Sequence, residues 1–222
     1  MQAAKFGGLG FFLLPNKTGL LWFCGLVVFI TSAISSELTL QIRKQYGEQA
    51  ERRFIEWEEL LQTAKNLPDL EKLQRANRFF NENVVFVNDI EHWKTEDYWA
   101  TPIEFLATGG GDCEDFAIAK YFTLKQLGVD ESKMRITYVK AFKLNQAHMV
   151  LTYFENPKAV PLVLDNLIPA IEPATKRRDL IPVYSFNGDG LWLAKSRGSG
   201  KRLGNAERLN LWQELNQRMQ SQ

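Results

Sequence analysis

The most informative segment of the chain is residues 109–128, with the sequence GGGDCEDFAIAKYFTLKQLG. Asp112 is a residue type that helix N-caps favour, and Asp115, three positions later, is the acidic partner of a capping box. Gly128 is the residue type that most often follows a helix. These signals predict a helix that begins at Cys113 and runs to Leu127. The three glycines before it allow close backbone approaches.

The predicted helix has almost no polar face. Its apolar side chains are Phe116, Ala117, Ile118, Ala119, Tyr121, Phe122, Leu124 and Leu127. A helix that is apolar all round is enclosed by the rest of its domain, so this one is the central helix. Cys113 then lies at its N-terminus, where unpaired backbone N–H groups and the helix dipole favour a thiolate. The same N–H groups could stabilise an oxyanion.

Two amphipathic helices are predicted upstream of this segment. Apolar residues recur at steps of three or four over residues 50–64 and again over residues 70–80, where Asp69 is the expected N-cap. Residues 84–87 are too short to classify by periodicity. Residues 88–111 are predicted to be loop-rich.

Downstream of the central helix, the apolar period changes to two. Strands are predicted at residues 134–138, 148–154, 160–165, 181–186 and 191–194. Helices first and strands later predict an α+β domain in which the central helix packs on an antiparallel β-sheet. An amphipathic tail helix is expected at about residues 203–220.

Composition excludes several classes of protein. The 222 residues, 45% of them hydrophobic and 24% charged, fit one globular domain rather than a disordered chain. Lys and Arg number 27 against 26 Asp and Glu, so no basic field exists to hold nucleic acid. Two cysteines and two histidines do not make a structural zinc site without carboxylates, nor a disulfide framework.

The N-terminal segment, residues 1–35, predicts export. Lys5 and Lys17 are the only charges before an apolar run at residues 20–30, and small residues follow it. We expect a signal peptide cleaved near Ser35, with an uncleaved membrane anchor as the alternative. Residues 36–222 then fold in an oxidising compartment with Cys113 as their one cysteine. A lone thiol there is either buried or used.

A catalytic cysteine needs a base, and the chain offers only His92 and His148. If the predicted strands around residues 148–154 and 160–165 form a hairpin that turns at residues 156–157, paired positions sum to 313. Asp165 would then lie opposite His148, close enough to accept from its imidazole N–H. Cys113, His148 and Asp165 thus form a candidate nucleophile, base and orienting acid. The alternative is a buried cysteine, a structural histidine and a turn aspartate.

Several spaced motifs resemble the bacterial transglutaminase-like cysteine proteases. They are Asp97–Phe105, Gly111–Phe116, His148–Leu151, Leu162–Leu167 and Pro182–Asn187. The resemblance covers roughly residues 37–194. It implies a papain/transglutaminase-like fold and a catalytic triad of Cys113, His148 and Asp165.

The resemblance also implies a biological role. It points to a calcium-dependent periplasmic endopeptidase that cleaves a large cell-surface biofilm adhesin near its N-terminal region and so releases it. An inner-membrane receptor that senses cyclic di-GMP would sequester the protease. Because hydrolysis and acyl transfer share the same thioester chemistry, an exported transglutaminase or amidase that acts on envelope protein or cell wall is the alternative.

The calcium requirement has a rationale in the residues themselves. Asp112, Glu114 and Asp115 place three carboxylates within four positions around the thiol, and their mutual repulsion would raise its pKa. A hard cation would neutralise them, and such oxygen ligands suit Ca²⁺. The alternative is that these acids only cap the helix and complement its dipole.

Overall fold

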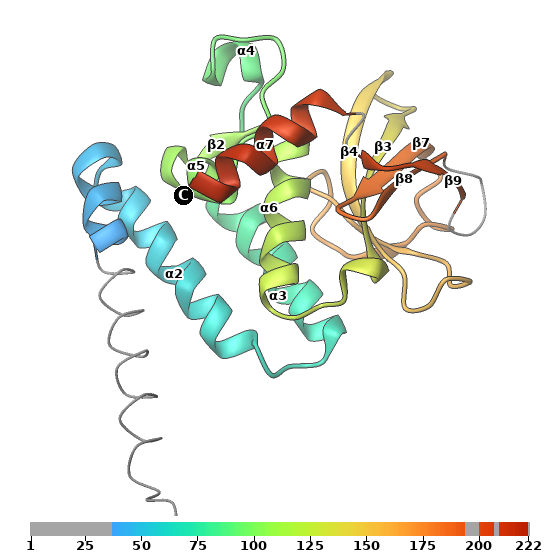
Figure 1. The fold of residues 1–222 in the computed structure, drawn as a ribbon, viewed down its shortest axis with the longest axis horizontal. Coiled ribbons are helices and arrows are strands. Elements are labelled where there is room, and N and C mark those ends of the chain that lie inside the picture. The colour runs from blue at the N-terminus through green and yellow to red at the C-terminus, as the bar shows by residue number, and fades with distance from the viewer. Residues whose placement is uncertain (1–36, 194–199, 207–208, 222) are drawn as a thin grey trace, which may run out of the picture. The chain divides into compact units, whose positions relative to one another are not determined.

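A computed structural model describes residues 37–193, 200–206 and 209–221 (Figure 1). The expected signal peptide or anchor, residues 1–35, and its cleavage near Ser35 lie outside these residues. Within the described ranges, no helix is both long and apolar enough to cross a bilayer. From Ile42 onward the chain forms one compact unit.

Helices dominate the first half of this unit and strands the second. The helices after residue 47 are α2 (Glu48–Ala64), α3 (Asp69–Asn83), α4 (Asp89–His92), α5 (Pro102–Thr108), α6 (Cys113–Gln126), the 3-10 turn η1 (Glu131–Lys133) and α7 (Asn210–Ser221). The strands are β1 (Val85–Phe86), β2 (Gly110–Gly111), β3 (Met134–Ala141), β4 (Gln146–Tyr153), β5 (Leu162–Leu164), β6 (Glu172–Pro173), β7 (Leu180–Asn187), β8 (Gly190–Leu193) and β9 (Lys201–Gly204).

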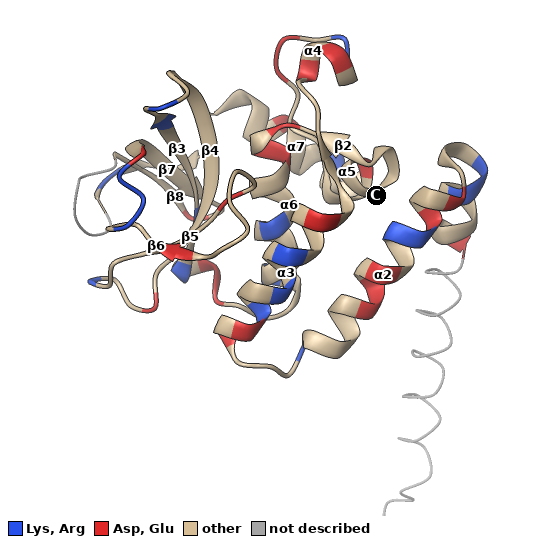
Figure 2. Cartoon of the chain, turned by 180° about the vertical axis from the view of Figure 1, so that it is seen from behind, with Lys and Arg blue, Asp and Glu red and all other residues tan. Residues whose placement is uncertain are grey.

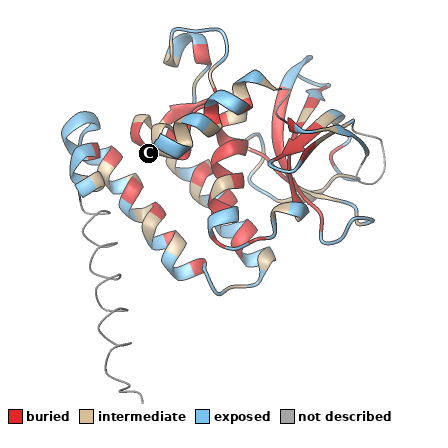
Figure 3. Cartoon of the chain, in the orientation of Figure 1, coloured by how far each residue is buried: buried red, intermediate tan, exposed pale blue. Residues whose placement is uncertain are grey.

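The predicted α+β class is confirmed. One antiparallel sheet has the strand order β6-β5-β4-β3-β7-β8-β9, while β1 and β2 form a separate parallel pair. Helix α6 packs against β4 and β3 and against α3 and α5 on its other sides. Figure 3 shows α6 buried along most of its length, whereas α2 keeps an exposed face. Figure 2 shows both signs of charge mixed along α2 and α3, consistent with the near-zero net charge.

Helix α6 begins and ends where its capping signals predict. Cys113 is its first residue, Asp112 its N-cap and Leu127 its C-cap. Gly128 has φ 83°, the left-handed conformation that favours glycine after a helix. Gly111 has a different reason to be glycine, because a Cβ there would collide with the Asp115 carboxylate and the Phe105 ring. The glycine turn therefore lets β2 approach the first turn of α6.

Four local predictions were wrong or incomplete. Asp69 is the first residue of α3, not its N-cap, and its carboxylate instead accepts from the Tyr153 hydroxyl (2.9 Å) and pairs with Lys133 (3.1 Å). Residues 88–111 contain α4 and also α5, which has a capping box between Thr101 and Glu104. The tail helix begins only at Asn210, because residues 201–204 form β9 on β8. The short edge strand β6 was also not predicted.

The hairpin register differs from the prediction by two residues. β4 and β5 pair as Leu151 with Leu164 and Thr152 with Val163, so paired positions sum to 315 rather than 313. Asp165 consequently lies just beyond the end of β5 and not opposite His148. A shift of two preserves the face of every side chain, because the side-chain period of a strand is two. His148 and Asp165 therefore still share a face.

Candidate active site

Cys113 and His148 line one cavity of about 890 Å³. The cavity lies where the start of α6 meets β4 and β7, and Trp99, Tyr138 and Tyr184 supply aromatic walls. Tyr138 and Tyr184 stack face to face with ring centroids 5.0 Å apart. The fold thus brings residues that are 35 positions apart in the sequence, 113 and 148, to the same pocket.

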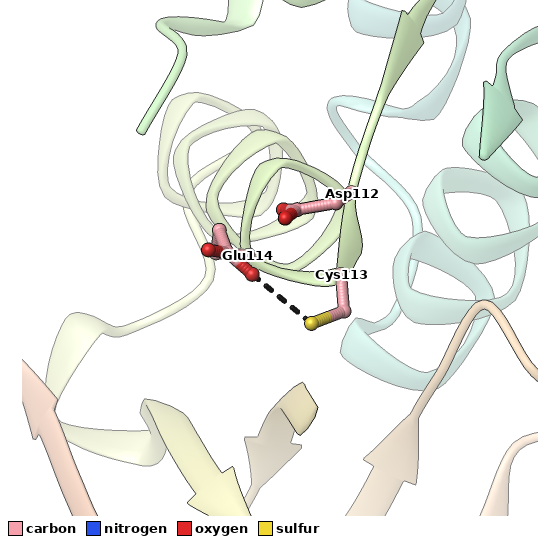
Figure 4. Close-up of side chains that lie close together, drawn as sticks. All are labelled: Asp112, Cys113 and Glu114. Atoms are coloured by element: carbon pink, nitrogen blue, oxygen red, sulfur yellow. Dashed lines mark hydrogen bonds between the residues drawn. The ribbon is translucent and has the colours of Figure 1, made fainter. Parts of the chain in front are cut away.

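The Cys113 thiol is half-buried and makes two hydrogen bonds with described residues. Sγ donates to Glu114 Oε2 (3.0 Å), as Figure 4 shows, and accepts from the Met149 backbone N–H (3.3 Å). Burial, followed by the negative charges of Glu114 and Asp112, holds the pKa of Cys113 well above its usual value, and the Met149 N–H opposes this. The repulsion expected between the acids and a thiolate is therefore present in this site.

His148 and Asp165 form a buried pair. His148 Nε2 lies 2.7 Å from Asp165 Oδ1, which also accepts from the Leu167 backbone N–H (3.1 Å). Asp165 Oδ2 forms an ion pair with Arg177 Nη2 (2.7 Å). Burial alone would raise the pKa of Asp165, but the contact with His148 and the other donors lower it to about 2. Asp165 is thus ionised at any physiological pH and fixes the orientation of the imidazole.

Side chains outside the predicted triad hold Asp165 in place. Asn81 on α3 donates its amide to the Asp165 carbonyl oxygen (2.8 Å), and Lys120 on α6 donates to the Asn81 amide oxygen (2.7 Å). Burial lowers the pKa of Lys120 to about 7. Arg177 also binds Asp179 through two hydrogen bonds (2.8 and 3.1 Å). Sequence reasoning missed all of these residues, because none belongs to a motif with a recognisable spacing.

Carboxylates from two other segments join those around the thiol. Asp89, Asp112 and Asp115 form one group and Asp89, Asp97 and Glu114 another, and within each group one oxygen per residue lies within 4.8 Å of the others. Asp112 and Glu114 also group with Cys113. Asp89 and Asp97 were not predicted, although Asp97 begins one of the quoted motifs. The acidic cluster therefore has five members, Asp89, Asp97, Asp112, Glu114 and Asp115.

The acidic cluster has the properties of a cation site. The pKa of Asp112 is raised to about 9 by burial, by a hydrogen bond with Glu114 and by the negative charge of Glu114. Burial also raises the pKa of the other four acids. Asp89 Oδ1 and Asp112 Oδ1 are buried and have no hydrogen-bond partner among the described residues. Unpaired buried carboxylate oxygens are costly, and a hard divalent cation with oxygen ligands would satisfy them.

Asp115 also has the structural role that the alternative assigned to it. Its Oδ1 accepts from the Ala100 backbone N–H (2.7 Å) and its Oδ2 from the Asp112 backbone N–H (3.3 Å). These bonds tie the loop before α5 to the start of α6. Helix capping and a cation site are therefore compatible at this residue.

The other histidine is placed elsewhere. His92 ends α4, packs edge-on against Trp93 with centroids 4.7 Å apart, and does not line the cavity. Of the two candidate bases, only His148 lies with Cys113.

Comparisons with known proteins agree with this geometry. A model of the bacterial transglutaminase-like cysteine proteinase family (BTLCP) matches residues 46–182. EGTA-treated Legionella pneumophila LapG is 42% identical with a TM-score of 0.73, covering 83% of this chain and 97% of that one. Calcium-bound Legionella pneumophila LapG is 44% identical with a TM-score of 0.71, covering 82% of this chain and 98% of that one. The search of curated proteins gave no match.

Proposed function

The chain belongs to the bacterial transglutaminase-like cysteine proteinase family, and we propose that it is a calcium-dependent periplasmic endopeptidase that cleaves a large cell-surface biofilm adhesin near its N-terminal region. The observation that carries the catalytic part is the shared cavity of Cys113 and His148, with Asp165 bound behind the imidazole. A structural cysteine and histidine would not need this arrangement.

In the proposed reaction, the Cys113 thiol gives its proton to His148 and the sulfur attacks the carbonyl carbon of the scissile peptide bond. The first backbone N–H groups of α6 lack helical acceptors and can bind the oxyanion. His148 then protonates the leaving amine as the C–N bond breaks. Water, activated by His148, hydrolyses the thioester and regenerates the thiol. Asp165 keeps the imidazole in one tautomer throughout.

The acidic cluster supports the calcium part of the proposal. Asp112, Glu114 and Asp115 would hold the ion, with Asp89 and Asp97 close enough to contribute. Bound Ca²⁺ would supply positive charge beside the nucleophile. Glu114 would then bind the cation instead of accepting a hydrogen bond from the thiol, and the Cys113 proton would be free to move to His148. A calcium-dependent rise in melting temperature would test this independently of activity.

The family relationship supports the proposed substrate and partner. The N-terminal segment supports the proposed location. We infer that residues 1–35 direct export to the periplasm, where the chain would meet an adhesin retained in the outer membrane. Control by an inner-membrane cyclic di-GMP receptor that sequesters the protease belongs to the same proposal. Cleavage near the N-terminus of the adhesin would release it from the cell.

The decisive experiment incubates the purified protein with Ca²⁺ and candidate exported adhesins, in the presence and absence of a primary amine. Discrete fragments would support an endopeptidase, with Cys113→Ala as the inactive control. Amine incorporation or crosslinked products without fragments would contradict the proposal and indicate a transglutaminase. Release of ammonia or of cell-wall fragments alone would indicate an amidase.

A further inference from the structure

A second cavity, of about 730 Å³, lies on a different face of the sheet from the thiol. It is lined by Thr137 and Val139 of β3, whereas Tyr138 between them lines the thiol cavity. Alternate residues of a strand point to opposite faces, so the sheet separates the two cavities at this point. Its volume is in the range of small-molecule sites. We call it the rear cavity.

The floor of the rear cavity is apolar. Val139, Val150 and Val163, from three neighbouring strands, form a buried cluster, and Ala174 and Leu180 pack against it. All five of these side chains line the cavity. A ligand would therefore bury an aliphatic or similarly apolar part here.

The rear cavity is cationic, in contrast to the thiol cavity. Its lining includes Arg135, Lys158, Arg177 and Arg178, and none of the described residues that line it is acidic. The thiol cavity has the opposite character, since Glu96, Asp97, Asp112 and Glu114 line it and no Lys or Arg does among the described residues. Charge complementarity therefore favours an anionic head group in the rear cavity.

Two of the arginines are fixed in position. Arg177 is 5% exposed, and while its Nη2 and Nε bind Asp165 and Asp179, its Nη1 is buried without a hydrogen-bond partner among the described residues. Arg135 stacks on Trp192 (3.8 Å) and Phe154 (5.1 Å). A planar guanidinium held this way is suited to bind a carboxylate.

We propose that the rear cavity binds a medium-length aliphatic carboxylate, with its chain on the valine floor and its head group among Arg135, Arg177, Lys158 and Arg178. The apolar floor excludes small inorganic anions as the complete ligand. The cationic lining excludes neutral and cationic amphiphiles as the preferred ones. The proposal does not rest on the proposed proteolytic function, although Arg177 also pairs with Asp165 of the candidate active site.

Isothermal titration of the full chain with octanoate, nonanoate and decanoate, below their micelle concentrations, tests the proposal. Each added methylene should tighten binding about fourfold, equivalent to about 0.8 kcal/mol. Decanol should bind at least about tenfold more weakly than decanoate, because it cannot form charge-assisted hydrogen bonds. Equal affinity for decanol and decanoate would overturn the anionic assignment.

Variants locate the binding. Ala174→Phe should fill the floor and abolish the specific titration, and Lys158→Glu with Arg178→Glu should weaken it at least about tenfold. Arg52→Glu on α2 combined with Arg75→Glu on α3 carries the same total change of charge at exposed positions outside the cavity and should bind as the wild type does. Melting curves establish that each variant is folded. Decanoate binding that is unchanged in folded Ala174→Phe would place the ligand elsewhere and overturn the proposal.

Discussion

Replacing Asp165 by asparagine should separate the catalytic from the structural role of this carboxylate. Both of its oxygens have partners: Oδ1 accepts from His148 and Leu167, and Oδ2 forms an ion pair with Arg177. An amide has one acceptor oxygen. If that oxygen stays on His148, the NH₂ faces the Arg177 guanidinium. If the amide flips, the NH₂ faces His148 Nε2 and favours the wrong tautomer.

The structure sets the size of the effect on stability. The pKa of Asp165 is lowered to about 2 by its native contacts, against about 3.9 in an unfolded chain. A difference of about two pKa units corresponds to about 2 to 3 kcal/mol of unfolding free energy at neutral pH. Because the native pKa is the lower one, this contribution is complete above about pH 4 and is lost as the pH falls through about 2.

Two measurements test the prediction. Urea unfolding at neutral pH should show Asp165→Asn less stable by about 2 to 3 kcal/mol, with the gap narrowing toward pH 2. The rate of adhesin cleavage should fall by a factor on the order of 10² to 10⁴. Alkylation of Cys113 by iodoacetamide, followed by mass spectrometry of its peptide, gives a substrate-free readout that should slow as well.

Asp179→Asn is the matched control. It also removes a carboxylate from Arg177, but the described Asp179 side chain pairs with Arg177 and not with His148, and it is 29% exposed. Asp179→Asn should lower the free energy of unfolding by about 1 kcal/mol or less and leave the cleavage rate within a few fold of wild type. A folded Asp165→Asn protein that cleaves at the wild-type rate would refute the assigned role of Asp165.

A double variant sharpens the argument. Asp165→Asn combined with Arg177→Gln replaces the guanidinium by an amide whose oxygen can accept from the new NH₂. The asparagine oxygen could then remain on His148. The double variant should therefore recover part of the rate lost in Asp165→Asn. A double variant slower than Asp165→Asn would show that the orientation of the amide is not the cause.

Three further predictions concern the nucleophile, the cation and the N-terminus. Cys113→Ala and His148→Ala should both fold, by circular dichroism, and yield no cleavage; fragments from either would contradict the mechanism. EGTA should abolish cleavage, and Ca²⁺ should restore it better than Mg²⁺ and raise the melting temperature. Asp97→Asn should weaken this shift in melting temperature more than Glu96→Gln does. An enzyme that is insensitive to EGTA and shows no calcium-linked shift would leave the acidic cluster with only a helix-capping role. The exported protein should have its N-terminus near Ser36, as N-terminal sequencing would show. An intact Met1 in the membrane fraction would instead indicate an anchor.

The sequence predicted those parts of the fold whose signals lie close together in the chain. Helix α6 was predicted to within one residue because its N-cap, its first turn and the glycine after it are all near neighbours in the chain. The strands β3, β4 and β7 were found from their period of two. β6 was missed because two residues cannot show a period, and β9 was missed because Leu203 is its one apolar side chain.

The predicted pairing of His148 with Asp165 survived an error in the register. The predicted turn at residues 156–157 was one position too early, since the observed pairing centres between residues 157 and 158. Moving the centre of a hairpin by one position shifts pairing by two, which keeps each residue on its predicted face. The bond between His148 and Asp165 therefore forms through the bend after Leu164 rather than across the ladder.

The acidic cluster shows where local reasoning ends. Asp112, Glu114 and Asp115 are contiguous with the nucleophile, so their repulsion could be inferred from the sequence alone. Asp89 and Asp97 lie in the segment between β1 and α5, and only the tertiary structure brings their carboxylate oxygens close to those of Asp112, Glu114 and Asp115. Buried carboxylates from separate segments repel one another unless a cation joins them. Two of the oxygens, on Asp89 and Asp112, are buried and have no hydrogen-bond partner within the described part of the chain. This favours a cation that links the segment between β1 and α5 to the start of α6, so calcium would order the cavity as well as neutralise its charge.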